Sequence, residues 1–176
     1  LKLYNGMCAD DETISPCFNP AGTYKANFDL SQDLKKITRN GNSHGIHFIL
    51  GSSEMLSKEK NSKFHVKIDA LNGGGVIVGV GIQGIQNGQA YSTTGSYCLA
   101  NPNGICENGT TKNYYNCSSI AQGSIIGVLF MPHKGKIVFD VDGTHVYTAK
   151  VLKTHLDAGL YPFVFISHQN SSASFI

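Results

Sequence analysis

The chain has 176 residues, a formal net charge of +2 and only 15% charged residues. The length fits one domain with a sizeable core. So few charges leave little material for the basic surface of a dedicated nucleic-acid binder, and we expect no nucleic-acid partner. No apolar run approaches the roughly 20 residues of a membrane span, so we expect no membrane partner either. The 20 glycines, nine Phe and eight Tyr favour strands and turns over helices.

Seven short segments have the composition of β-strands. The clearest is 64–70, where Phe64, Val66, Ile68 and Ala70 alternate with polar residues, as in a half-buried strand. In chain order the predicted strands are 45–50, 64–70, 76–82, 125–131, 136–141, 144–151 and 160–166. No βαβ alternation separates them, and no long stretch keeps a helical period. The pattern predicts an all-β antiparallel sandwich or barrel.

Two connections stand out between these strands. Asp142-Gly143 lies between alternating runs and predicts a tight hairpin. Residues 83–122, rich in Asn, Gly, Ser, Thr and Tyr, have no clear strand pattern and are interpreted as one long loop region. Because loops of that length tend to be functional, this region is a candidate for binding.

The five cysteines, Cys8, Cys17, Cys98, Cys106 and Cys117, are odd in number, and no two have the C-x-x-C spacing of a zinc knuckle or redox motif. We interpret them as free thiols in a reducing compartment, which predicts a cytoplasmic or intracellular protein. His44 and His47 form the closest histidine pair, but their spacing suits neither a strand face nor a zinc-binding helix. We therefore expect no metal.

Two motifs suggest chemistry that their surroundings do not support. Residues 79–84 have the glycine spacing of a dinucleotide fingerprint, but neither a helix nor the required acid follows. We expect no cofactor there and interpret the glycines as marks of a tightly packed strand. Residues 137–144 resemble the first motif of haloacid-dehalogenase phosphatases, in which Asp140 would be the nucleophile and Asp142 the general acid/base. Too few residues follow for the α/β domain of that family, so a hairpin is the preferred interpretation.

Three segments resemble motifs of the SPRY (B30.2-like) domains in the same order. They are 123–130, similar to the family's G-D-x-I-G strand, 135–143, similar to its G-x-I-x-F-x-x-N-G hairpin, and 160–164, similar to its L-Y-P-x-V strand. Residues 64–68 and 78–81 agree with two earlier strands of the family, and 18–20 with 28–31 resemble the amino-terminal strands of the B30.2-type module. The resemblance implies a two-sheet antiparallel β-sandwich over residues 17–176, with long loops at one end. Residues 1–16 are then an N-terminal extension.

The same resemblance implies a non-enzymatic module that binds a peptide or loop of a partner protein through end loops. It suggests the substrate-recognition part of a ubiquitin ligase or an adaptor, built as a monomeric domain of a larger protein. Alignment with peptide-binding members predicts partner-binding residues at Tyr91 and at Ser167, His168 and Gln169. Tyr114 and Tyr115 are candidates by chemistry, because exposed Tyr gives a large contact area at low entropic cost. The alternatives are a phosphatase using Asp140 and Asp142, and a carbohydrate-binding β-sandwich.

Overall fold

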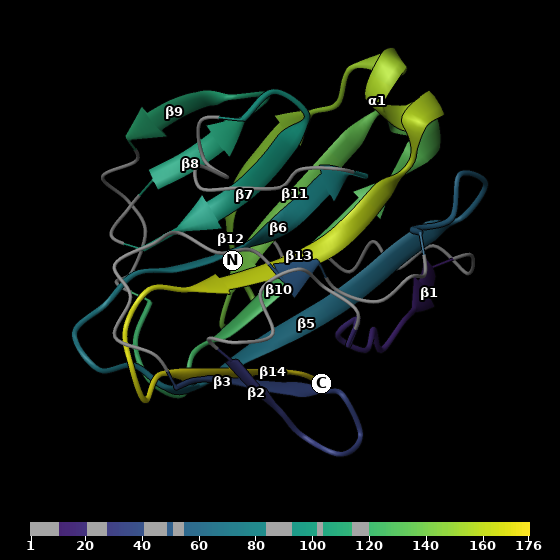
Figure 1. Ribbon diagram of the computed structural model, residues 1–176. Coiled ribbons are helices and arrows are strands. Elements are labelled where there is room, and N and C mark those ends of the chain that lie inside the picture. The colour runs from purple at the N-terminus through teal and green to yellow at the C-terminus, as the bar shows by residue number, and fades with distance from the viewer. Residues whose placement is uncertain are drawn as a thin grey trace.

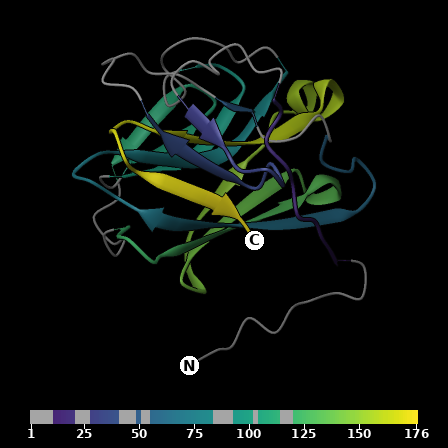
Figure 2. The ribbon, with the colours of Figure 1, turned by 60° about the horizontal axis from the view of Figure 1, so that its bottom comes forward.

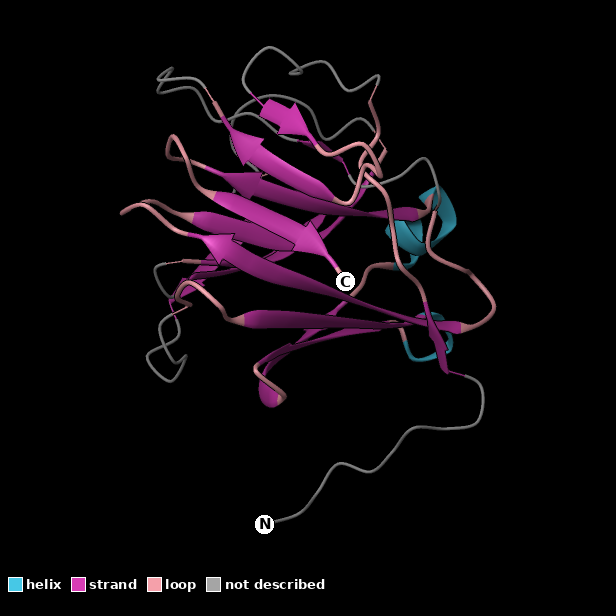
Figure 3. Cartoon of the chain, turned by 90° about the horizontal axis from the view of Figure 1, so that it is seen from below, coloured by secondary structure: helices cyan, strands magenta, loops and turns pink. Residues whose placement is uncertain are grey.

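The computed structural model describes residues 11–20, 28–40, 49–50, 55–83, 93–101, 104–113 and 120–176. These residues form two sheets that face each other across one core, as seen in Figures 1 and 3. The eight-stranded sheet has the order β12-β11-β10-β5-β14-β3-β2, with β1 paired to β5. The six-stranded sheet has the order β4-β13-β6-β7-β8-β9. The predicted two-sheet, essentially antiparallel sandwich is confirmed.

The strands are short, and two brief helical segments accompany them. The eight-stranded sheet contains β1 (Asp11–Thr13), β2 (Phe28–Leu30), β3 (Lys36–Arg39), β5 (Asn61–Ala70), β10 (Ile125–Met131), β11 (Lys136–Val141), β12 (Thr144–Lys150) and β14 (Ser172–Phe175). The six-stranded sheet contains β4 (Ile49–Leu50), β6 (Val76–Ile82), β7 (Ser96–Ala100), β8 (Gly104–Glu107), β9 (Thr110–Asn113) and β13 (Leu160–Ile166). A 3₁₀ turn spans Pro132–Lys134 and α1 spans Lys153–Ala158. No helix among the described residues is long and apolar enough to cross a membrane.

Strand β5 is central to the larger sheet and shows how the sequence pattern produces the fold. Phe64, Val66 and Ile68 are buried, while the residues between them are less buried, as the alternation predicted. The carboxy-terminal strand β14 pairs with β5 on one side and β3 on the other, which Figure 2 shows clearly. The inward residues of both sheets form the main core, and each buried Val, Ile or Phe contributes about 1.5 to 3 kcal/mol.

The hairpin between β11 and β12 is confirmed. Asp142 has φ 52° and Gly143 has φ 75°, and positive φ at both central residues is what a two-residue type I′ turn requires. Gly79 in β6 is also packed as expected, since an added Cβ would lie 2.2 Å from the Tyr97 carbonyl oxygen.

The interpretation of residues 83–122 as one long loop is wrong for the part that the structure describes. Strands β7, β8 and β9 lie in this region and extend the six-stranded sheet to its edge. Asn108 and Gly109, with φ 52° and 79°, make a second two-residue hairpin between β8 and β9. Polar composition concealed β9, because Thr, Asn and Lys at a sheet edge can face solvent while the backbone still pairs. Strands β7 and β8 are largely buried but short, and polar residues surround them in the sequence.

Candidate functional site

The turn between β13 and β14 carries three predicted binding residues: Ser167, His168 and Gln169. Ser167 is fastened to Gly75 in the β5–β6 turn, because its N–H donates to the Gly75 carbonyl oxygen (2.9 Å) and the Gly75 N–H donates to its Oγ (2.6 Å). Gln169 Nε2 donates to the carbonyl oxygen of Asn40 at 3.2 Å. The side chains of Ser167 and Gln169 therefore fix the turn against two other connections.

His168, like Gln169, is an exposed residue of this turn. Its side chain is exposed, and its Nδ1 lies 2.7 Å from Ser167 Oγ. The imidazole covers Gly74, since an added Cβ at that position would lie 2.0 Å from His168 Nδ1. Among the described residues, Nε2 of His168 has no hydrogen-bond partner. This nitrogen is therefore available to an external ligand.

A pocket of about 450 Å³ adjoins this turn. The pocket is formed by three connections, and its lining residues are Leu71, Gly73, Gly74, Gly75, Asn101, Ile120, Ala121 and Gln122. Asn101 Nδ2 donates to the Ile120 carbonyl oxygen at 3.1 Å, which joins the end of β7 to the segment before β10. The volume is within the range of sites that hold small ligands or single side chains of a peptide.

A buried arginine forms hydrogen bonds to the β13–β14 turn and to the end of β13. Arg39, the single arginine of the chain, is 1% exposed, and its Nη1 donates to the Ile166 carbonyl oxygen at 3.2 Å. Its guanidinium lies over the Phe28 ring, 5.4 Å from the centroid, and burial lowers its pKa. The Arg39 backbone also pairs with Asn170 and Ser171 of the turn. Sequence reasoning missed this residue, because the polar residues that follow it give no sign that its side chain is buried.

The other three predicted binding residues, Tyr91, Tyr114 and Tyr115, lie outside the described residues. Asn113, the last described residue before Tyr114 and Tyr115, pairs with Gly104, next to the end of β7. Ile120, the next described residue after them, lines the pocket. The segment of Tyr91 joins the described chain at the far end of β6, where Ile82 N–H donates to the Gly95 carbonyl oxygen. The roles of all three tyrosines stay predictions.

Asp140 and Asp142, the acids of the phosphatase-like motif, do not lie in the α/β domain that this motif requires. Their strand, β11, is in an antiparallel sheet. Asp142 Oδ1 accepts the Ile125 N–H at 2.8 Å, and the Asp140 carboxylate lies over Gly127, where any Cβ would clash with it. In the described part of the chain, no three His, Cys, Asp or Glu side chains are placed to hold a metal ion. Both acids thus have structural contacts in the sheet.

The comparisons with known proteins agree with this architecture. The family model described as SPRY domain matches residues 61–176. Among solved structures, the TRIM65 PSpry domain superposes with a TM-score of 0.73 at 12% identity, covering 94% of this chain and 93% of that chain. The SPRY domain of human HERC1 gives 0.67 at 18% identity, covering 90% and 96%. Stonustoxin gives 0.69 at 16% identity, covering 94% of this chain but 27% of that chain. No curated protein matches the sequence.

Proposed function

The chain belongs to the SPRY domain family, and on that premise we propose that it is a non-catalytic module that captures a peptide or loop of a partner protein. The proposed binding surface, called here the pocket end, consists of the 450 Å³ pocket and the adjoining turn 167–169. The observation that carries the proposal is the exposed imidazole of His168, which is held beside this pocket by Ser167 and Gly74.

The lining of the pocket suggests how such a partner binds. Leu71 and Ile120 offer apolar contact, while Asn101 and Gln122 offer polar groups. Gly73 has no side chain, and an added Cβ there would meet nothing within 4 Å, so the main chain of a peptide can approach its backbone closely. We expect an extended segment that places one apolar side chain in the pocket and hydrogen-bonds to the rim, with His168 Nε2 as one contact. Tyr91, Tyr114 and Tyr115 remain proposed contributors.

The wider setting of the module is also a proposal. We propose that it serves as the recognition part of a ubiquitin ligase or an adaptor inside the cell, as a monomeric domain of a larger protein. The resemblance to the SPRY family supports the proposed recognition role. The free thiols of Cys17, Cys98 and Cys106 fit the proposed reducing compartment.

Binding measurements on matched variants test the proposed surface. The immobilised domain captures partners from lysate, peptide mapping defines the bound segment, and calorimetry measures its affinity for the parent protein and two variants. His168→Ala should weaken binding by about 1 to 3 kcal/mol, the scale of interface hot spots, with an unchanged melting temperature. His145→Ala, which removes an exposed histidine from β12, should bind like the parent. Equal affinities for the parent and His168→Ala would overturn the proposal.

The two alternative functions have distinct signatures. Magnesium-dependent hydrolysis of a phosphate ester that is lost in Asp142→Asn would support the phosphatase. Binding to a glycan array, with no peptide captured, would support the carbohydrate-binding sandwich.

A further inference from the structure

A second cluster of buried side chains lies on the face of the six-stranded sheet that points away from the main core. It contains Ile77, Cys98, Cys106, Phe163 and Phe165. Its two cysteines are both 0% exposed and are free thiols. The binding function proposed above uses neither of them, so their arrangement needs a separate explanation.

The two cysteines are direct neighbours across two strands. Cys98 in β7 and Cys106 in β8 are partners in the antiparallel register. Directly opposite residues have Cα atoms about 4.5 to 5.5 Å apart, which lies within the range of about 4.4 to 6.8 Å that a disulfide spans. A disulfide between them is therefore compatible with the existing pairing of β7 with β8.

The surroundings make the two sulfurs chemically unequal. The neighbouring Cys98 side chain lowers the pKa of Cys106 to about 7 against the effect of burial, and Ser96 assists, with its Oγ 3.4 Å from Cys106 Sγ. Burial raises the pKa of Cys98 well above its ordinary value. A thiol with a lowered pKa beside one with a raised pKa is the arrangement of a nucleophilic and a resolving cysteine.

We propose that Cys98 and Cys106 are a redox-active dithiol, which hydrogen peroxide oxidises to a disulfide that joins β7 to β8. The Cys106 thiolate attacks one peroxide oxygen, the O–O bond breaks, and the departing hydroxide takes a proton to become water. Cys106 is then a sulfenic acid. The Cys98 sulfur attacks the Cys106 sulfur, the S–O bond breaks, and the hydroxyl leaves as water with the Cys98 proton. Two thiols and one peroxide give one disulfide and two waters.

The position of Cys98 and Cys106 near the sheet edge gives hydrogen peroxide a route to the thiols. It also means that a disulfide there affects how β8 separates from β7. Strand β9 is the edge of its sheet, so β8 lies one strand from the edge. Local opening of such an edge admits a small neutral oxidant to buried thiols. Once formed, the disulfide opposes separation of β8 from β7 and slows amide hydrogen exchange over residues 104–113.

Peptide mapping of the parent protein tests the proposal directly. Fully reduced protein is freed of reductant, treated with a slight excess of hydrogen peroxide, unfolded and alkylated. The number of alkylated thiols should fall from five to three, and the linked peptides should join Cys98 to Cys106. An unchanged thiol count, or a disulfide between any other pair, would overturn the proposal. This readout needs no variant to fold.

Single substitutions then test the order of the steps. In Cys98→Ser, whose hydroxyl can still donate a hydrogen bond to Cys106 but cannot form a disulfide, the sulfenic acid on Cys106 should persist and be trapped by dimedone. Cys106→Ala should give no dimedone adduct at Cys98. Cys17→Ala is the matched control, because Cys17 lies outside the cluster, and it should form the disulfide like the parent. An adduct on Cys98 in place of Cys106 would contradict the assigned roles.

Discussion

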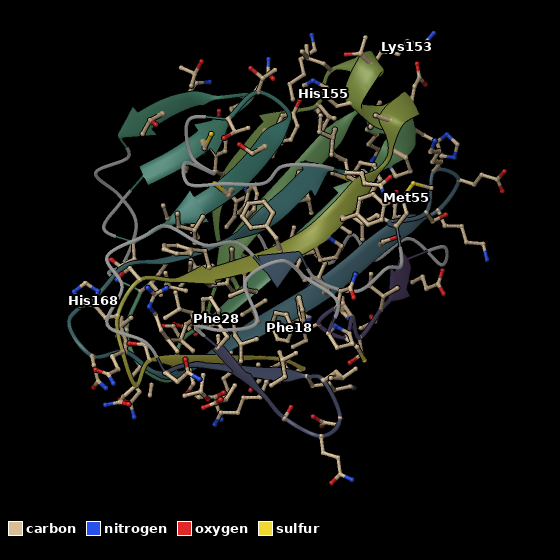
Figure 4. All side chains as sticks on the ribbon, viewed as in Figure 1. Phe18, Phe28, Met55, Lys153, His155 and His168 are labelled. Carbon is tan, nitrogen blue, oxygen red and sulfur yellow. The ribbon has the colours of Figure 1, made fainter. Side chains whose placement is uncertain are left out.

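The two ends of the sandwich each carry a histidine, of which one is buried and the other exposed. His155 in α1 is 8% exposed, and its Nδ1 lies 2.8 Å from the hydroxyl of Tyr97. His168 lies at the other end of the molecule with its side chain exposed, as Figure 4 shows. The same side-chain type therefore closes the fold at one end and faces outward beside a pocket at the other.

The difference extends to the surroundings of each histidine. At the α1 end, the Leu152 N–H donates to the Tyr97 hydroxyl at 3.1 Å, so this hydroxyl joins the start of the helix to His155. Met55 covers Gly159, where an added Cβ would lie 2.0 Å from its Sδ. The pocket end instead has an open cavity beside a glycine-rich turn. We infer that polar groups of the α1 end stabilise the fold and those of the pocket end bind.

The largest expected effect is on stability at the α1 end. Tyr97→Phe removes the hydroxyl and leaves His155 Nδ1 without its partner in a buried site. The free energy of unfolding should fall by about 1 to 3 kcal/mol, measured by urea denaturation. Affinity for the mapped peptide should stay unchanged. A loss of affinity without a loss of stability would reverse the roles assigned to the two ends.

The next effect concerns binding at the pocket end. Gly74→Ala places a methyl group against both the imidazole and the Cβ of His168, so the ring and the backbone of its turn must shift. Binding of the mapped peptide should weaken by about 1 kcal/mol or more, and the urea midpoint should fall as well. Calorimetry and urea denaturation measure the two quantities.

A double-mutant cycle sharpens this prediction. If Gly74→Ala acts by displacing His168, then adding it to His168→Ala should cost no further affinity. Additive losses would show that the methyl group itself blocks the ligand.

The smallest expected effect is on the pH dependence of the free energy of unfolding. Glu107 at the end of β8 accepts hydrogen bonds from Lys112 Nζ, the Tyr147 hydroxyl and the Lys150 N–H, and so joins β8 to β12. Burial alone would raise the pKa of Glu107, but these hydrogen bonds hold it below its ordinary value of 4.5. The contact therefore stabilises the fold above about pH 4.5 and is lost as the pH falls further.

The expected contribution of Glu107 is below about 1 kcal/mol, because the Lys112 side chain is 44% exposed and water screens the ion pair. Urea midpoints measured between neutral and acidic pH should fall less steeply in Glu107→Gln than in the parent. Glu59→Gln, at an exposed carboxylate, is the matched control and should follow the parent curve. An identical pH dependence in parent and Glu107→Gln would contradict this account.

Much of the sandwich could be predicted because its inner strands are strongly apolar. The bounds of β6, β10, β11 and β13 coincide with the predicted segments. Strand β5 begins three residues early, at Asn61, because backbone pairing continues beyond its apolar pattern. Strands β7, β8 and β9 were missed as separate strands, although Asn108-Gly109 is the turn signal that marks their hairpin.

The candidate site could be predicted only in part. Family resemblance indicated the turn of Ser167, His168 and Gln169, but not that Ser167 and Gln169 are held within the fold. The pocket could not be predicted, because connections far apart in the sequence form it only after both sheets have packed. The contact of His168 with Gly74 could not be predicted either. It requires the β5–β6 turn and the β13–β14 turn to meet in the folded structure.

Hydrogen exchange of the parent protein, with and without the mapped peptide, tests whether partners bind around His168. We expect slower exchange over residues 73–75 and 167–169 when the peptide is bound, with no change over Lys153–Ala158. Protection of the α1 end, with exchange at the pocket end unchanged, would contradict the assignment of binding to the surface around His168.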